Sequence, residues 1–156
     1  MGIEIERKYR IRTQEWQNLS HHQFSIRQGY TSTAAEQTIR VRCCEQKAWL
    51  TIKSKAQNGK RLEFEYPIPI EDANEMLNEW ASNRIIHKTR HHVRVEQHVW
   101  EIDVFHGANE GLIIAEIELT STDERFKLPS WVGEEVTEDH RYSNSNLSVN
   151  PFQNWS

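Results

Sequence analysis

Long apolar runs are missing from this 156-residue sequence, and cysteine is scarce. No stretch of 18 apolar residues occurs, so no transmembrane helix is expected. The N-terminal segment Met1–Glu6 lacks a basic region followed by an apolar run, which argues against a secretory signal and favours the cytoplasm. The two cysteines, Cys43 and Cys44, are neighbours. On a strand they would point to opposite faces, so we expect no disulfide between them.

A basic excess is missing as well. The formal net charge is −4, whereas nucleic-acid-binding proteins usually carry a clustered excess of Lys and Arg. We therefore expect no nucleic-acid partner, and no membrane partner either. The length suggests one domain over residues 1–156, and no repeat of solenoid or propeller length divides it.

What the sequence does contain is a period-two alternation of apolar and charged residues, the pattern of half-buried strands. Eight segments show it: 3–12, 24–31, 38–45, 48–55, 61–66, 85–95, 99–105 and 112–120. Eight mostly antiparallel strands are typical of a closed barrel whose interior holds side chains or one small ligand. The predicted fold is therefore mainly β (α+β), a closed eight-stranded antiparallel β-barrel with two to four peripheral helices.

Turn and breaker residues place the ends of several strands. Asn58-Gly59 predicts a tight hairpin turn, and a second hairpin is expected around residues 96–97. Pro67 and Pro69 are expected to end the strand over 61–66. Gly29 lies inside the second segment and predicts either a bulge or a close approach of another part of the chain.

Three segments predict helices. Apolar residues recur at helical spacing over 71–81. The sequence Ser121-x-x-Glu124 forms a capping box, so we expect a short helix there that Pro129 stops. A further short helix is expected near 143–148.

The charged faces of the strands carry pairs of the same sign two residues apart. The acidic pairs are Glu4/Glu6, Glu63/Glu65, Glu101/Asp103 and Glu116/Glu118, and the basic pairs are Arg40/Arg42, Lys53/Lys55 and Lys88/Arg90. Like charges this close cost energy unless opposite charge lies between them. Two explanations stay open. Acidic and basic strands could cancel across a solvent-exposed face, or the faces could line one cavity that holds cations on its acids and an anion on its bases.

The second arrangement describes a site for a metal-bound polyphosphate. Mg²⁺ is typically bound by one or two carboxylates plus substrate phosphates, and Arg and Lys neutralise phosphate oxygens. Period-two spacing would aim these groups into one lumen. By contrast, the adjacent pairs His21-His22 and His91-His92 lack the spacing of ligands that share one face of an element, and we expect no metal there.

The first strand carries a resemblance to a known family. Glu4-Ile5-Glu6-Arg7-Lys8 matches the E-x-E-x-K signature of the CYTH superfamily, the triphosphate tunnel metalloenzymes, at the N-terminal position where that family has it. Further matches follow in order: Gln28-Gly29-Tyr30, Arg40-x-Arg42, Lys53, Arg61, Lys88-x-Arg90, Glu101-x-Asp103, Glu116-x-Glu118, and Glu135-Val136-Thr137 leading to Arg141-Tyr142. The resemblance spans nearly the whole chain, and the sequence looks most like the short, single-domain bacterial tripolyphosphatases of the superfamily.

The resemblance implies an eight-stranded antiparallel tunnel and assigns roles to its inward residues. The divalent metals, Mg²⁺ or Mn²⁺, would face Glu4, Glu6, Asp103, Glu116 and Glu118. The phosphates would be gripped by Arg40, Arg42, Lys53, Arg61, Lys88 and Arg90. Lys8 and Tyr30 match positions proposed in close relatives to act on the attacking water, and it stays open whether Lys8 takes a proton or only positions that water. Glu63 and Glu65 could bind metal or balance basic neighbours.

The activity implied is divalent-metal-dependent hydrolysis of a linear triphosphate, above all inorganic tripolyphosphate, to diphosphate and phosphate. Three alternatives stay open: an adenylate cyclase, a triphosphatase acting on thiamine triphosphate or a nucleotide, and a sensor that binds polyphosphate or nucleotide without turnover. A small anionic triphosphate is the expected partner. The oligomeric state is open, a homodimer included.

Overall fold

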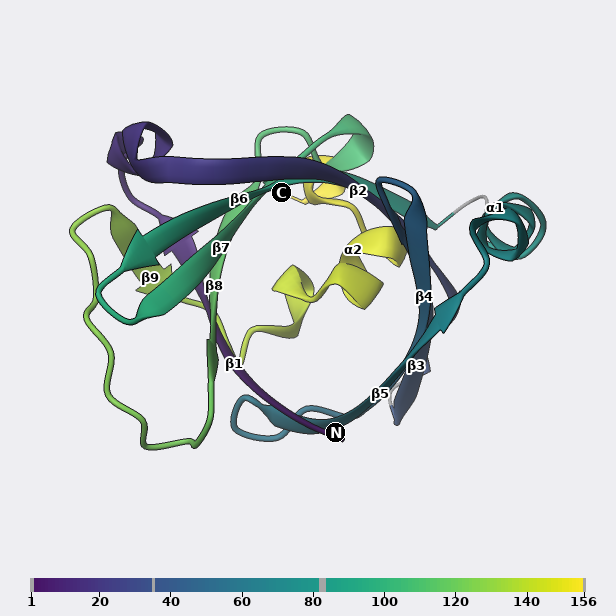
Figure 1. Ribbon diagram of the computed structural model, residues 1–156, viewed down its shortest axis with the longest axis horizontal. Helices are drawn as coiled ribbons and strands as arrows, with labels where there is room; N and C mark the ends of the chain where they lie inside the picture. Colours follow the sequence, from purple (N-terminus) through teal and green to yellow (C-terminus); the bar gives the residue numbers. More distant parts are fainter. Residues whose placement is uncertain (1, 35, 82–83, 156) are drawn as a thin grey trace.

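The computed structural model describes residues 2–34, 36–81 and 84–155. Within them, nine strands form one antiparallel sheet that closes on itself (Figure 1). In spatial order the strands are β5 (Lys60–Ile68), β4 (Lys47–Ser54), β3 (Gln37–Cys44), β2 (Ser20–Ser32), β6 (Ile85–Val95), β7 (His98–Phe105), β8 (Ile113–Leu119), β1 (Ile3–Ile11) and β9 (Val132–Glu135). Pairing of β1 with β5 closes the ring, and the extra strand β9 pairs with the other end of β1. The predicted closed eight-stranded barrel is thus confirmed.

The described helices are short. α1 (Ile70–Glu79) lies outside the ring, whereas α2 (Asn144–Val149) lies across its opening (Figure 1). Segments of 3₁₀ helix occur at Glu15–Leu19, Gly107–Asn109, His140–Tyr142 and Phe152–Asn154. The helices expected over 71–81 and near 143–148 are confirmed, but α2 is not peripheral, because Asn144 and Ser145 line a cavity inside the barrel. No helix that the structure describes has the length and apolar character needed to span a bilayer.

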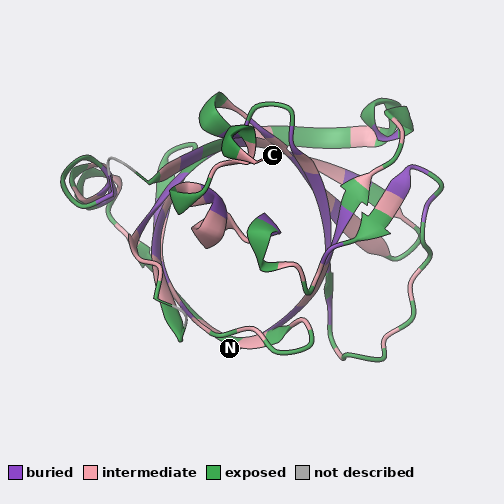
Figure 2. Ribbon diagram, turned by 180° about the vertical axis from the view of Figure 1, so that it is seen from behind, coloured by how far each residue is buried: buried purple, intermediate pink, exposed green. Residues whose placement is uncertain are grey.

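The barrel places its charged side chains inside, and two buried apolar clusters lie outside its wall. Tyr9 of β1 packs outward on Trp100 with ring centroids 5.6 Å apart, and Trp131 of the loop after β8 packs on Trp100 at 5.7 Å. Outside β3 and β4, Leu77 of α1 belongs to a second buried cluster with Val41. Figure 2 shows the buried positions following the barrel strands. These two clusters lie between the barrel wall and its outer cover. A third cluster, which includes Tyr30, Phe105 and Leu147 of α2, packs on the inner side of the wall beside the charged part of the lumen.

The structure explains why glycine occurs at two positions that the sequence analysis named. Asn58 and Gly59 adopt φ values of 55° and 77°, the left-handed conformations that a tight hairpin needs. The Gly59 carbonyl accepts a hydrogen bond from the Glu6 N–H at 2.9 Å, so this turn fixes β1 next to a candidate metal ligand. At Gly29, a Cβ atom would lie 2.6 Å from Cβ of Ala81, which confirms the predicted close approach.

The expectation that prolines end the strand over 61–66 was wrong. β5 continues to Ile68, with Pro67 opposite Trp49 in the ladder with β4. Proline is tolerated in a strand where its missing N–H faces away from a partner. β5 pairs with β1 through residues 60–62, so the edge of β5 at Pro67 lies beyond that pairing.

The capping box at 121–124 does not start a helix, and so Pro129 has no helix to stop. The Glu124 carboxylate instead accepts hydrogen bonds from the backbone N–H and the hydroxyl of Thr120 at 2.6 and 2.7 Å. The same carboxylate lies 2.6 Å from Nε2 of His98. A side chain held this way is not free to cap, and the chain follows an irregular loop to β9. β9 itself was not predicted, because it is short and contains a glycine.

A charged cavity as candidate active site

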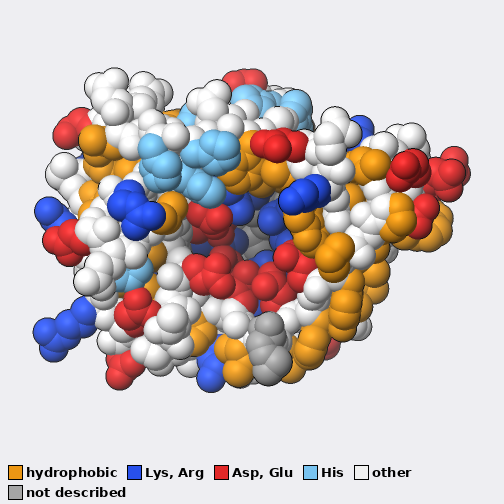
Figure 3. Space-filling model, in the orientation of Figure 1, with side chains coloured by type: hydrophobic (Ala, Val, Ile, Leu, Met, Phe, Trp, Pro, Cys, Tyr) orange, Lys and Arg blue, Asp and Glu red, His pale blue; other side chains and the backbone are white. Residues whose placement is uncertain are grey.

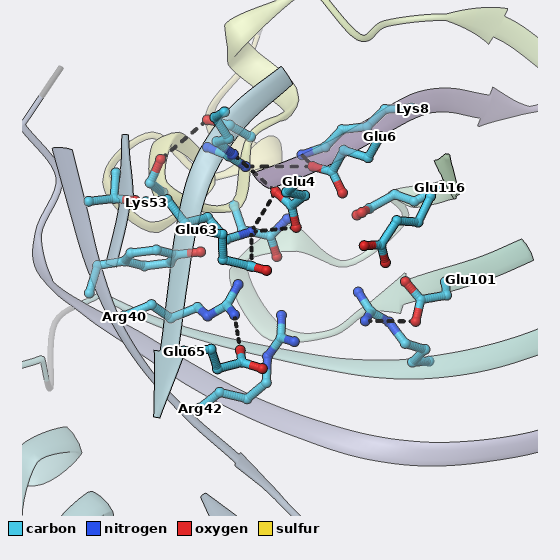
Figure 4. A pocket seen from close by; sticks show the side chains of 18 of the residues that line it. Glu4, Glu6, Lys8, Arg40, Arg42, Lys53, Glu63, Glu65, Glu101 and Glu116 are labelled. Atoms are coloured by element: carbon cyan, nitrogen blue, oxygen red, sulfur yellow. Dashed lines mark hydrogen bonds and ion pairs between the residues drawn. The ribbon is translucent and has the colours of Figure 1, made fainter. Parts of the chain in front are cut away.

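A cavity of about 190 Å³ lies inside the barrel, and charged side chains line it. Every predicted site residue except Asp103 lines this cavity: Glu4, Glu6, Lys8, Tyr30, Arg40, Arg42, Lys53, Arg61, Lys88, Arg90, Glu116 and Glu118. Figure 3 shows acidic and basic side chains within the opening, and Figure 4 shows them converging from opposite strands. The explanation of these charges as a solvent-exposed face is therefore wrong.

The acidic wall comes from three neighbouring strands. Glu6 of β1 lies opposite Glu118 of β8, and Glu116 of β8 lies opposite Glu101 of β7. Directly opposed like charges destabilise a sheet. Burial, together with the charge of Glu6, raises the pKa of Glu116. Burial, together with the charges of Glu4 and Glu101, raises the pKa of Glu118 to about 7. A cation bound between these carboxylates would relieve both effects.

Glu4 is where the acidic and basic walls meet. Lys53 Nζ donates to both of its carboxylate oxygens at 3.2 Å, and Arg61 Nε donates to one of them at 3.2 Å. Although burial opposes the change, these two bases lower the pKa of Glu4 to about 2. Glu4 is therefore ionised but already paired. To bind a metal ion, its carboxylate would have to give up a contact with Lys53 or Arg61.

Glu63 and Glu65, whose role the sequence left open, lie among the bases. Glu63 is 3.4 Å from Lys53 Nζ. Glu65 accepts hydrogen bonds from Arg40 at 3.2 Å and from the Thr51 hydroxyl at 2.8 Å. These contacts favour a charge-balancing role for both carboxylates.

The basic wall collects Arg40, Arg42 and Arg90. Arg42 Nε donates to Gln28 Oε1 at 2.8 Å. Burial, with the charges of Arg40 and Arg90, lowers the pKa of Arg42 to about 10, which leaves it charged at neutral pH. Among the described residues, Arg40 Nε is a buried donor without a hydrogen-bond partner. An incoming polyanion would neutralise this crowded positive charge.

Asp103 is the predicted site residue that the structure places elsewhere. It is 0 % exposed and is not among the described residues that line the cavity. Its oxygens accept hydrogen bonds from Lys88 at 2.7 Å and from Arg90 at 2.7 and 2.9 Å. Against the effect of burial, Arg90 and Lys88 hold the pKa of Asp103 well below its usual range. Both oxygens of Asp103 are thus engaged by two bases, and its side chain lies outside the lining of the cavity.

Two amides that the sequence analysis did not assign join the basic wall. Gln28 is fully buried, and its Nε2 donates to the Tyr30 hydroxyl at 3.1 Å and to Asn144 Oδ1 at 3.2 Å. Asn144 Oδ1 also accepts from Lys88 Nζ at 2.9 Å, so α2 is tied to the site. The match of Gln28 to the family motif was the available signal for it. Nothing in the local sequence around Asn144 indicates its contact.

Lys8 lies among the acids of the cavity. Its Nζ is 3.8 Å from a Glu6 oxygen. Burial would lower the pKa of Lys8, but Glu116 and Glu6 together raise it above its usual value. Lys8 is therefore an ammonium ion, which suits it to orienting a water molecule rather than to removing a proton from one.

Divalent cations fit the acidic wall by its donor chemistry, because carboxylate oxygens are the ligands that Mg²⁺ and Mn²⁺ prefer. In the described parts of the chain, no three His, Cys, Asp or Glu side chains stand close enough together to enclose a metal ion by themselves. This arrangement suits ions held by one or two carboxylates, with substrate phosphates and water as the remaining ligands.

A closed antiparallel barrel with one acidic and one basic wall in its lumen is the arrangement that the resemblance to the triphosphate tunnel metalloenzymes predicts. The CYTH domain matches residues 2–149, and the chain belongs to this family.

Two similar proteins and one solved structure agree with this assignment. The inorganic triphosphatase of Acetivibrio thermocellus is 43% identical over 155 residues, which cover 99% of this chain and 99% of that protein. The inorganic triphosphatase of Nitrosomonas europaea is 35% identical over 150 residues, covering 94% of this chain and 97% of that protein. A crystal structure of an inorganic triphosphatase superposes with a TM-score of 0.66 at 33% identity, covering 94% of each chain. The family resemblance predicted from the sequence is confirmed.

Proposed function

We propose that this chain hydrolyses inorganic tripolyphosphate to diphosphate and phosphate in the barrel cavity, with Mg²⁺ or Mn²⁺ as cofactor. The observation that carries the proposal is the barrel cavity in which buried Arg and Lys side chains face buried glutamates. A linear triphosphate with divalent cations matches the charge of both walls. The names of the two similar proteins from Acetivibrio thermocellus and Nitrosomonas europaea support the same substrate.

In this proposal the basic wall binds and neutralises the phosphates. Arg40, Arg42 and Arg90 offer planar guanidinium donors suited to pairs of phosphate oxygens, and Lys88 adds a point charge. Asp103 keeps Lys88 and Arg90 oriented before substrate arrives. Phosphoryl transfer needs positioning and charge neutralisation more than covalent catalysis. Donors that are already fixed stabilise the developing charge without reorganising during the reaction.

The acidic wall would hold the cations through Glu116 and Glu118, with Glu6 beside them. Bound there, a divalent cation supplies charge neutralisation at phosphate oxygens and lowers the pKa of a coordinated water. Lys8 donates a hydrogen bond to the attacking water and so orients it in line with the bond to be broken. The Tyr30 hydroxyl, fixed by Gln28, borders the same space.

Phosphate release from tripolyphosphate with Mg²⁺ or Mn²⁺ tests the proposal. We expect phosphate and diphosphate in equal amounts, and no release once a chelator removes the metal. Glu118→Gln keeps the shape of the side chain but removes its charge, so it serves as the control. Release by the wild-type chain no faster than by Glu118→Gln would contradict the proposed function.

Product identity separates the other candidates. An adenylate cyclase would convert ATP to cyclic AMP, and an organic triphosphatase would act faster on ATP or thiamine triphosphate than on tripolyphosphate. A sensor would bind tripolyphosphate in calorimetry without releasing phosphate. We expect tripolyphosphate to be the best substrate of such a panel, because the lining of the cavity is charged on nearly every side.

The apparent affinity for tripolyphosphate should fall above about pH 7. Burial lowers the pKa of Lys88 to about 7, despite Asp103, which raises it. A lysine with a lowered pKa loses its charge as the pH rises through that value, so the free enzyme then has one fewer cation for phosphate. The profile of kcat/KM against pH reports the free enzyme. It should decline more steeply in the wild type than in Lys88→Arg, which stays charged. Since titration of the substrate affects both proteins equally, parallel profiles would contradict this assignment.

A further inference from the structure

The outer face of β5 carries a stripe of exposed apolar side chains. Leu62, Phe64 and Tyr66 point outward from alternate positions and are 48 %, 45 % and 53 % exposed. Ile3 of β1, opposite Leu62 in the ladder, is 57 % exposed. We call these four residues the β5 stripe. In Figure 3, apolar side chains follow the lower right edge of the molecule, where Figure 1 has β5 and β4.

Elsewhere the barrel covers its apolar outer face. Phe126 and Trp131 cover β1 and β7 around Trp100, and α1 covers β3 and β4 around Val41. The β5 stripe stays open to solvent by comparison. With about 200 Å² for a large apolar side chain, exposure of about half leaves roughly 400 Å² of apolar surface on four residues. Patches of this size on monomers are often functional.

We propose that the β5 stripe is the centre of a homodimer interface with two-fold symmetry. A standard interface covers about 800 Å² on each partner, with an apolar core and a polar rim. The stripe supplies about half of that area as the core. A two-fold axis at Phe64 would set two sheets face to face, with Tyr66 of one copy over Leu62 of its partner. This inference goes beyond the proposed catalytic function and does not depend on it.

The charges at the two ends of the stripe favour a second copy as the occupant. Lys60 is exposed beyond the Leu62 end. At the other end the chain passes into α1, whose charged residues are all acidic and exposed: Glu71, Asp72, Glu75 and Glu79. An antiparallel arrangement about Phe64 brings Lys60 of each copy toward α1 of its partner, so opposite charges meet at both ends of the interface.

The stripe also crosses the seam that closes the barrel. In the described chain, β1 and β5 pair at three positions, between Ile3–Ile5 and Lys60–Leu62. Glu4 and Arg61 of this seam point into the cavity. A partner that packs on both strands from outside stabilises the closed ring, because it binds only the protein in which β1 and β5 are paired. The dimer would thus support the wall of the site without contributing a residue to it.

Light scattering over a dilution series of the full chain tests the dimer. We expect a dimer whose dissociation constant rises at least about 100-fold in Phe64→Lys and in Tyr66→Lys, since a central apolar anchor is lost from both copies. Leu128→Lys is the matched control, because Leu128 is also exposed, at 54 %, but lies on the loop after β8. A wild-type chain that is monomeric at every concentration, or a Phe64→Lys variant that dimerises like the wild type, would overturn the proposal.

Crosslinking tests the position of the axis with a milder substitution. Sheets packed face to face lie about 10 Å apart, so a short bismaleimide should join two copies of the Phe64→Cys variant. Leu128→Cys should give no more product than the unsubstituted chain, whose Cys43 and Cys44 set the background. The melting temperature of the wild type should also rise with protein concentration. Absence of a Phe64→Cys crosslink above background counts against the proposal, and neither readout involves phosphate hydrolysis.

Discussion

Glu116→Gln should remove most tripolyphosphate hydrolysis while leaving the fold at least as stable as the wild type. Loss of one electrostatic contribution in an active site typically lowers the rate about 10²–10³-fold, and we expect a fall of this order in kcat/KM. The stability expectation follows from the surroundings of the carboxylate. Burial and the charge of Glu6 raise the pKa of Glu116, so its ionised form is unfavourable in the folded protein. A neutral amide should therefore not lower the melting temperature measured without divalent cations.

A matched control and a metal titration make this result specific. Glu134 is an exposed acid on β9, and Glu134→Gln should change neither activity nor melting temperature. If Glu116 binds a cation, the Mn²⁺ concentration for half-maximal rate should rise at least about tenfold in Glu116→Gln. A variant that keeps near wild-type kcat/KM would exclude Glu116 from the metal-binding group. Loss of activity together with a lower melting temperature would instead indicate a structural role.

The barrel could be predicted because its alternation has a physical cause at every strand. β1 shows this most clearly, since Ile5 and Tyr9 join the outer core while Glu6 and Lys8 face the lumen. The alternation lies within a single strand, so it can be recognised without knowing which strands pair. The capping box failed for the opposite reason. Glu124 is held by His98, which is 26 residues away in sequence, and local spacing cannot foresee a partner at that distance.

The sequence predicts which side of each strand faces the lumen, but it does not predict how far along the tunnel a side chain lies. Glu101 and Asp103 share a face of β7, and alternation treats them alike. The Glu101 side chain is 34 % exposed and lines the cavity, whereas that of Asp103 is 0 % exposed and lies behind the bases. Position along the axis of the tunnel has no period in the sequence. Asn144 was not predictable either, because α2 enters the opening of the barrel from a segment with no alternation of its own.

Asp103→Asn should destabilise the fold strongly and weaken phosphate binding together. Removing one partner from a buried ion pair costs about 3–5 kcal/mol, because the remaining charge stays buried without compensation. Here the substitution leaves the buried Arg90 guanidinium without its counter-ion, and Lys88 loses the carboxylate that opposes the lowering of its pKa. For a domain of this size the melting temperature should fall by roughly 6–20 °C. At temperatures where the variant is still folded, KM for tripolyphosphate should rise, because both bases lose the contact that orients them.

Glu101→Gln is the matched control for this prediction. Glu101 is on the same strand and lies 3.3 Å from Arg90, but its side chain is 34 % exposed. A pair that is open to solvent contributes about 0–1 kcal/mol, so this variant should melt close to the wild type. Adding Lys88→Met to Asp103→Asn should recover part of the lost stability, since a buried amine that has lost its carboxylate partner disappears with it. Equal melting temperatures for Asp103→Asn and Glu101→Gln would show that the Asp103 cluster does not support the basic wall.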